Sequence, residues 1–281
     1  MLRASGRWAE VGERVYQRRY QPWDVSVVAV VGEDGVLLAD TRGGLAQAAE
    51  LRADLRRLTR LPVRWVVNTH AHFDHAWGNA EFVAPRQVPP AQLWAHRAAA
   101  AELASPAPEV AAEAGPLPPD FRLAVPDRLV EDSGHVLDLG GGRVVELRWA
   151  GRGHTGGDLW LRVPDADVLL AGDLVEESGP PALGADSYPL DWAPTLSRVL
   201  DDASLLGPDT VVVPGHGAPV GRDFVAAQRD SLAELASAIR AAFAEGRPAA
   251  KGLPPLAPWG DPALLAQAYA RGVSQLRAAP R

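Results

Sequence analysis

Four metal-ligand side chains stand within six positions of one another, shortly after a short apolar segment. The segment Val63–Val67 has the β-branched composition of a buried strand and leads into His70, His72, Asp74 and His75. Side chains two positions apart on extended backbone point the same way, so His70 and His72 can contact one metal ion from one side. Asp74 and His75 follow where the chain turns, and they can face a second ion. The sequence therefore predicts a rigid strand that ends in a metal site.

The composition narrows the chemistry of that site. The chain has 281 residues, seven histidines and no cysteine, so disulfides, thiolate ligands and a cysteine nucleophile are all excluded. Any metal ion must be bound by imidazole nitrogen and carboxylate oxygen. The net charge of −7 disfavours a polyanionic partner, because nucleic-acid binding normally needs a basic surface. We therefore expect a small-molecule substrate and no nucleic-acid partner.

Hydropathy argues against a membrane partner. The longest strongly apolar stretches, such as Val25–Val31, are far shorter than the ~20 residues of a membrane-spanning helix. The N-terminal residues mix charges throughout and lack the apolar region of a secretory signal. We therefore expect a cytoplasmic location and no membrane association, whereas the oligomeric state is left open.

Hydrophobic periodicity predicts strands and helices that recur in a similar order in both halves of the chain. In the first half it predicts a hairpin over Val25–Val31 and Val36–Ala39, a helix over 45–59 and the strand Val63–Val67. In the second half it predicts strands at 129–131, 136–139, 143–149, 159–163, 168–171 and 210–213, a helix over 191–203, and mostly helix from about 221, with a last helix from about 262. The Pro-rich segments 104–120 and 253–258 are predicted to be loops or breaks.

Three more ligand-capable residues stand at predicted strand ends, each beside glycine. His154 lies in Gly-Arg-Gly-His-Thr-Gly-Gly-Asp, Asp173 in Ala-Gly-Asp, and His216 in Pro-Gly-His-Gly. Glycine allows the backbone to approach closely at such positions. Each residue alone would be an ordinary turn residue, but together with the first motif they form a set.

In these motifs the sequence resembles the metallo-β-lactamase superfamily. The order His-x-His-x-Asp-His, Gly-His-Thr-x-Gly-Asp, Gly-Asp and Gly-His-Gly is that family's motif order. The resemblance implies an α/β fold, a four-layer αβ/βα sandwich of two mixed β-sheets with helices outside and metals in a cleft at one edge. We expect a single such domain over residues 1–281, with its core at 25–220 and a C-terminal helical segment at 221–281.

The resemblance also implies two metal ions per chain with separate ligand sets. Carried over by position, the first ion is held by His70, His72 and His154, the second by Asp74, His75 and His216, and Asp173 bridges both. Asp173 departs from the true β-lactamase branches, which have Cys or Ser there. The branches that resemble glyoxalase II, lactonases and related thioesterases are therefore the nearer comparison.

This ligand set suits hydrolysis. Imidazole and carboxylate favour Zn²⁺, and Mn²⁺ or Fe²⁺ also accept them. Two ions about 3.5–4 Å apart can share a hydroxide whose pKa falls toward about 7. That hydroxide is the expected nucleophile on a small ester, thioester, lactone or amide. Asp74 is the expected catalytic residue, which orients the hydroxide and passes a proton to the leaving group.

Other residues near the motifs admit two interpretations. Phe73 and Trp77 interleave the first motif and either wall the substrate cleft or pack beneath the metals. Tyr188 either donates to a substrate oxygen or packs its own loop. His96 either supports a ligand or faces solvent on a helix, whereas His135 is expected at the surface. Asp158, just after His154, is expected to have a structural role.

Three other functions fit parts of the pattern. Some relatives with this motif order bind one iron and oxidise a persulfide, and His70, His154 and Asp173 could serve as the required two-His, one-carboxylate set. A nuclease is disfavoured by the acidic balance of the chain. A scaffold without metals is disfavoured because all the ligand positions are filled.

Overall fold

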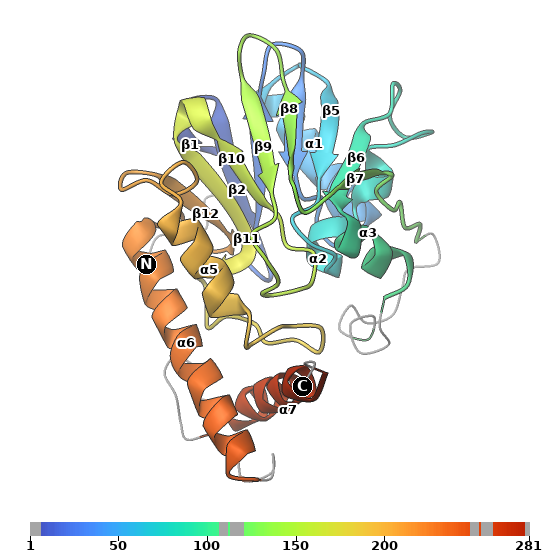
Figure 1. Ribbon diagram of the computed structural model, residues 1–281. Helices are drawn as coiled ribbons and strands as arrows, with labels where there is room; N and C mark the ends of the chain where they lie inside the picture. The colour runs from blue at the N-terminus through green and yellow to red at the C-terminus, as the bar shows by residue number, and fades with distance from the viewer. Residues whose placement is uncertain (1–6, 107–111, 113–120, 248–252, 254–260, 279–281) are drawn as a thin grey trace.

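The first half of the chain forms a mixed sheet (Figure 1). The computed structural model describes residues 7–106, 112, 121–247, 253 and 261–278. Neighbouring strands pair antiparallel from β1 to β4 and parallel from β4 to β7. These strands are β1 (Ala9–Gly12), β2 (Val15–Tyr20), β3 (Val25–Val31), β4 (Val36–Ala39), β5 (Val63–Val67), β6 (Gln92–His96) and β7 (Arg128–Val130).

A second mixed sheet follows. Its strands pair antiparallel from β8 to β11, and β11 pairs parallel with β12. They are β8 (His135–Asp138), β9 (Val144–Arg148), β10 (Trp160–Val163), β11 (Val168–Glu176) and β12 (Val211–His216). The two sheets join where His216 of β12 pairs with Val25 of β3. A predicted metal ligand therefore lies at the junction of the sheets.

The two sheets pack face to face over a common core. Val28 and Val30 of β3 belong to the same buried cluster as Leu161 of β10 and Leu170 of β11. The alternate residues of β3 face the other way, where Val27 packs in a cluster with the first helix. Because both faces of β3 are covered, all its residues are buried, as its continuous apolar sequence predicts.

Helices cover the outer faces of both sheets. Helix α1 (Leu45–Leu58) packs on the first sheet. Helices α5 (Trp192–Asp201), α6 (Arg222–Ala244) and α7 (Pro262–Ala278) form one buried cluster with the second sheet. Shorter helices lie in the connections: α2 (Phe73–Ala76), α3 (Arg97–Ala104), and the 3₁₀ turns η1 (Asn79–Glu81) and η2 (Pro164–Ala166). The layers confirm the predicted α/β sandwich of mixed sheets with outer helices.

Two strands run further than their sequences predict. Strand β11 continues through Gly172 to Glu176, and β12 continues to His216. Gly172 was expected to end the strand. Instead the register between β11 and β12 is irregular at Gly172, and the strand continues past it. Asp173 is consequently a strand residue, not a turn residue.

Other expectations for regular structure have mixed outcomes. The sequence favours Asp191 as the N-cap of α5, but its side chain makes no capping hydrogen bond and pairs with Arg152. Most of the Pro-rich segments 104–120 and 253–258 lies outside the described residues. Among the helices of the described part, none is long and apolar enough to cross a membrane.

Candidate metal centre

The seven predicted ligands meet at one edge of the sandwich. Each of them is at most 8% exposed. They are supplied by the loop after β5 (His70, His72), by α2 (Asp74, His75), by the loop between β9 and β10 (His154), by β11 (Asp173) and by the end of β12 (His216). Residues up to 146 positions apart are thus brought together by the pairing of the two sheets.

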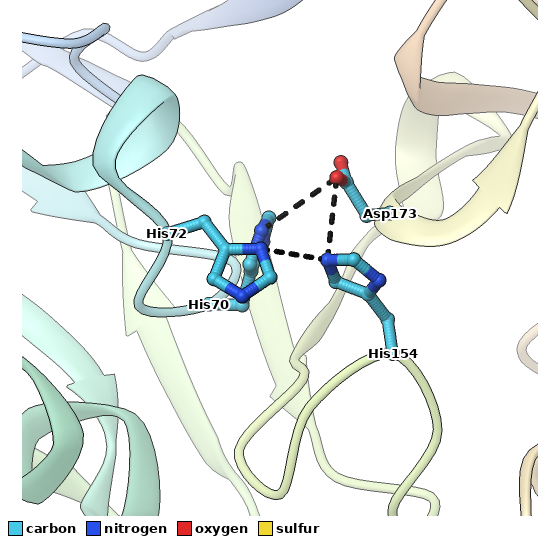
Figure 2. Close-up of side chains that lie close together, drawn as sticks. All are labelled: His70, His72, His154 and Asp173. Carbon is cyan, nitrogen blue, oxygen red and sulfur yellow. Dashed lines mark hydrogen bonds and ion pairs between the residues drawn. The ribbon is translucent and has the colours of Figure 1, made fainter. Parts of the chain in front are cut away.

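The first ligand set consists of His70, His72, His154 and Asp173, whose ligand atoms all lie within 4.8 Å of one another (Figure 2). The Nδ1 of His72 is 2.8 Å from the Nε2 of His154. The Oδ2 of Asp173 is 3.4 Å from the Nε2 of His154 and 3.7 Å from that of His70. Four potential donor atoms therefore enclose one point, which suits a single metal ion.

The second ligand set consists of Asp74, His75 and His216, also with ligand atoms within 4.8 Å. The Nε2 atoms of His75 and His216 are 3.2 Å apart, and they lie 3.6 and 3.4 Å from the Oδ2 of Asp74. Asp173 reaches this set as well, with Oδ1 3.2 Å from His75 and Oδ2 3.3 Å from His216. Asp173 therefore faces both sets.

Backbone carbonyls fix the ring orientation of two ligands. The Nδ1 of His154 is 3.1 Å from the oxygen of Ala182, and the Nδ1 of His216 is 2.7 Å from that of Trp23. A carbonyl oxygen only accepts, so both Nδ1 atoms must donate. In the neutral rings, Nε2 then carries a lone pair that points into the site.

Carboxylates and a hydroxyl orient the other three rings. His75 Nδ1 donates to Asp40 at 2.8 Å, and His72 Nε2 to Asp186 at 2.9 Å. The Thr69 hydroxyl donates to Asp40, so it accepts from His70 Nδ1 at 3.0 Å. All five imidazoles thus turn a lone pair inward, which is the arrangement that outer hydrogen bonds impose on metal-binding histidines.

The residues fit a metal ion. His70 Nε2 and Asp173 Oδ1 are buried and have no hydrogen-bond partner among the described residues. Buried polar atoms normally have one, and leaving them without costs about 1–3 kcal/mol each. Inward lone pairs and carboxylate oxygens would all be satisfied by cations bound at these two sets.

The electrostatics of the site favour positive charge. Burial disfavours the charged form of His216, but the charge of Asp173 and its hydrogen bond outweigh burial and raise the pKa of His216 to about 9. Burial likewise opposes the charging of His72, yet Asp186 raises its pKa to about 9. Burial and the charge of His72 lower the pKa of His154 to about 4. The carboxylates therefore attract cations, and the first set offers neutral His154 as a ligand.

Glycine makes room for the central carboxylate. A Cβ at Gly215 would lie 1.8 Å from the Oδ1 of Asp173. The glycine beside His216 in the sequence motif is therefore required because β12 passes directly over Asp173. Gly172 has a φ of +50°, which favours glycine. A Cβ added to Gly172 would also lie only 2.7 Å from the Cβ of Thr69.

A cavity of about 280 Å³ opens onto the ligands. Its walls are largely apolar and come from several elements, namely Trp23, Phe73, Ala182, Leu183, Gly184 and, on α7, Leu264 and Gln267. Phe73 packs edge to face against Trp23, with ring centroids 5.2 Å apart. Phe73 therefore lies in the cavity wall, which is one of the two positions that the sequence allows.

Trp77 and Tyr188 lie away from this lining. Trp77 is buried and packs against Phe121, with ring centroids 4.8 Å apart. Tyr188 lines a different cavity, beside Arg152 and Arg271. The structure thus brings Phe73 to the ligands and leaves the other two aromatic candidates outside the metal cavity.

Several residues of the site were missed by sequence reasoning. Asp40, Asp186 and Glu102 have no ligand-like spacing, and they reach the site only through tertiary contacts. Glu102 of α3 shares a hydrogen bond with Asp186, and burial together with that contact raises the pKa of Glu102 to about 8. Glu102, Asp186 and His72 consequently form a hydrogen-bonded row that leads away from the first ligand set.

The remaining singled-out residues have local roles. His96 ends β6, where its Nδ1 accepts from the Ala98 amide at the start of α3, and it neither faces solvent nor contacts a ligand. His135 is exposed, as expected, and stacks on Trp94. Asp158 accepts hydrogen bonds from the amide and hydroxyl of Thr155, which fixes the loop that carries His154.

Comparisons with known proteins agree with this site and fold. The family model of the metallo-beta-lactamase superfamily matches residues 20–216. The chain therefore belongs to the metallo-beta-lactamase superfamily, and its fold and ligand clusters are those of a metal-dependent hydrolase of that superfamily. One relative, the metallo-beta-lactamase type 2 of Bacillus cereus, is 34% identical over 79 residues. That match spans 27% of this chain and only 30% of the relative.

Solved structures show the same fold. A metallo-beta-lactamase from Pontibacter korlensis has a TM-score of 0.64 at 21% identity, covering 80% of this chain and 97% of that one. The enzyme FIM-1 from Pseudomonas aeruginosa, in its mono-zinc form, has a TM-score of 0.62 at 20% identity, covering 82% of this chain and 95% of that one. At such identities the likeness concerns the fold alone.

Proposed function

We propose that the protein is a dinuclear metal-dependent hydrolase of a small ester, thioester, lactone or amide. The observation that carries the proposal is the position of Asp173 between two complete ligand sets, each with its own histidines. A mononuclear enzyme needs only one such set. The second set, with Asp74, His75 and His216 all buried, would otherwise be a costly cluster of polar groups.

Zinc is the proposed metal, with Mn²⁺ or Fe²⁺ as other ions that the same donors accept. The solved FIM-1 structure is named as a mono-zinc form, which supports zinc for this fold. When bound, the ions would polarise the substrate carbonyl and lower the pKa of water. His70, His72 and His154 would hold one ion, and Asp74, His75 and His216 the other.

Water is the proposed source of the nucleophile. Among the described residues that line the metal cavity, none is a serine, threonine or cysteine. Asp74 lies in that lining, and 11% of its side-chain surface is exposed. In this proposal Asp74 accepts a proton from attacking water and returns it to the leaving group. The described lining thus offers a carboxylate that can carry a proton, and no hydroxyl or thiol that could act as a covalent nucleophile.

The cavity supports a small acyl substrate. Trp23, Phe73, Leu183 and Leu264 present apolar surface around the ligands, and Gln267 adds one amide. A volume of about 280 Å³ holds a compact group better than a polymer. This shape favours hydrolysis of small molecules over cleavage of nucleic acid.

Metal analysis combined with an isotope experiment tests the proposal. Protein purified without added metal should contain close to two Zn²⁺, and a panel of chromogenic esters, thioesters, lactones, phosphodiesters and β-lactams should identify an acyl substrate. A single turnover in ¹⁸O-labelled water should then put the label into the product. One iron per chain with no hydrolysis would favour a persulfide dioxygenase instead. Unlabelled first-cycle product would show a covalent route.

A further inference from the structure

A second cavity lies beside the metal cavity, and its described lining contains none of the candidate metal ligands. It has a volume of about 480 Å³ and includes three arginines in its lining, Arg152, Arg240 and Arg271. Arg152 belongs to the loop that carries His154, Arg240 to α6 and Arg271 to α7. Guanidinium groups from three separate segments therefore converge on one hollow.

The charges of this second cavity are not balanced by its own lining. Asp191 is the only acidic side chain among the described lining residues, and it pairs with Arg152 at 2.5 Å. Arg240 and Arg271 form no ion pair with any described residue. Their hydrogen bonds go to backbone carbonyls, from Arg240 to Leu190 at 3.5 Å and from Arg271 to Ser187 at 3.0 Å. A chain of net charge −7 thus leaves two cationic groups uncompensated here.

Cation–π contacts with Tyr188 hold two of the three arginines in advance. The guanidinium carbons of Arg152 and Arg271 lie 4.4 and 5.6 Å from the ring centroid of Tyr188. Arg271 also donates through both Nε and Nη2 to the Ser187 carbonyl. Side chains held in this way lose little further freedom when a ligand binds, which favours affinity.

One face of α7 connects the two cavities. Leu264 and Gln267 line the metal cavity, whereas Arg271, Ser274 and Gln275 line the second. Residues at this spacing share one face of a helix. The segment from Gly184 to Tyr188 lies between the cavities, since Gly184 lines the first and Tyr188 the second.

We propose that the second cavity binds a small organic anion through a carboxylate or phosphate group held by Arg240 and Arg271. Guanidinium presents a planar set of donors that matches the oxygens of both groups. Ser274 and Gln275 add polar side chains that can bond neighbouring atoms of the ligand. The anion is either a separate molecule or the acidic end of a substrate, and the recognising chemistry is the same.

Calorimetric titration with inorganic phosphate, and then with succinate, tests this site. The wild-type protein should bind saturably, and Arg240→Gln and Arg271→Gln should each raise the Kd about tenfold or more. Arg229→Gln is the matched control, because Arg229 lies on α6 like Arg240 but pairs with Asp230 and lines neither cavity. Absence of saturable binding, or equal Kd values in wild type and Arg240→Gln, would overturn the proposal. Phosphate that binds only to metal ions would give equal Kd values in wild type and Arg240→Gln.

The variant Arg271→Lys tests whether Arg271→Gln loses affinity only because the local structure changes. Arg271→Gln could loosen the loop at Ser187, whereas Arg271→Lys keeps the charge and should restore part of the affinity. Melting temperatures close to wild type in Arg240→Gln show that any loss of binding is local. Turnover of a chromogenic ester that carries a terminal carboxylate distinguishes the two sources of the anion. Phosphate should raise KM if the cavity holds part of the substrate, and leave KM unchanged if the anion is separate.

Discussion

The Nδ1 of His72 lies 2.8 Å from the Nε2 of His154, although the two residues are 82 positions apart. Each ring donates its other N–H elsewhere, His72 to Asp186 and His154 to the carbonyl of Ala182. Two lone pairs would therefore face each other at hydrogen-bond distance. Only a proton or a metal ion between them relieves that repulsion, so protons and metal must compete for the site.

This competition predicts how metal binding depends on pH. In the metal-free protein the pKa values of His72 and His216 are raised to about 9, so both rings are protonated at pH 7. A metal ion must displace those protons, and its affinity should therefore rise with pH between pH 7 and 9. Calorimetry at pH 7 in buffers of different ionisation enthalpy should show one or more protons released per binding event. Constant affinity from pH 7 to 9 would contradict the raised pKa values.

Asp173→Ala should remove most of the bound metal and the activity, because this carboxylate faces both ligand sets. Asp158→Ala is the matched control. It loses the hydrogen bonds that hold the His154 loop and should lower stability by about 1–3 kcal/mol while retaining much of the metal. Elemental analysis and thermal melting of both variants measure these effects. Similar metal content in the two variants would show that Asp173 does not bridge.

Gly215→Ala should displace Asp173 and so lose metal, because the added Cβ would lie 1.8 Å from its Oδ1. Gly221→Ala is the control, since no atom lies within 4 Å of a Cβ added there. That variant should stay within about 0.5 kcal/mol of wild type in stability. Zinc titration and chemical denaturation test the pair, and full zinc binding by Gly215→Ala would be incompatible with the observed packing of β12 on β11.

Asp186→Ala should weaken metal binding about 10–100-fold, because the His72 ring loses the acceptor that orients it. Asp132→Ala removes a comparable acceptor from His96, which contacts no ligand, and should leave metal affinity unchanged. Competition with a chromogenic chelator gives both dissociation constants. Equal affinities would mean that His72 is positioned by its backbone alone.

Asp74→Asn should keep at least part of the metal while losing most of the turnover rate. The amide can still offer an oxygen to the site, but it cannot accept and return a proton. Measuring kcat alongside bound zinc separates the two roles. A variant with full activity would leave Asp74 as a ligand only.

The candidate metal ligands could be selected from the sequence because that choice depends on residue type and local order. His70 and His72 follow a strand whose apolar composition is unambiguous, and the lack of cysteine limits the donors to nitrogen and oxygen. The strands β3, β4 and β5 were predicted with their observed bounds, since buried β-branched runs between turns have few alternatives.

Tertiary structure decided how those ligands are oriented and what surrounds them. The acceptors at Asp186, Ala182 and Trp23 have no motif, because they are set by packing between distant segments. The same holds for Tyr188, which lies among arginines of α6, α7 and the His154 loop rather than at the metal ligands. Strand β11 continues through Asp173 because its neighbour β12 accommodates the irregular register there. Residue chemistry is local and can be read from the sequence, whereas a side chain's direction and partners depend on contacts that form only when the sheets pack together.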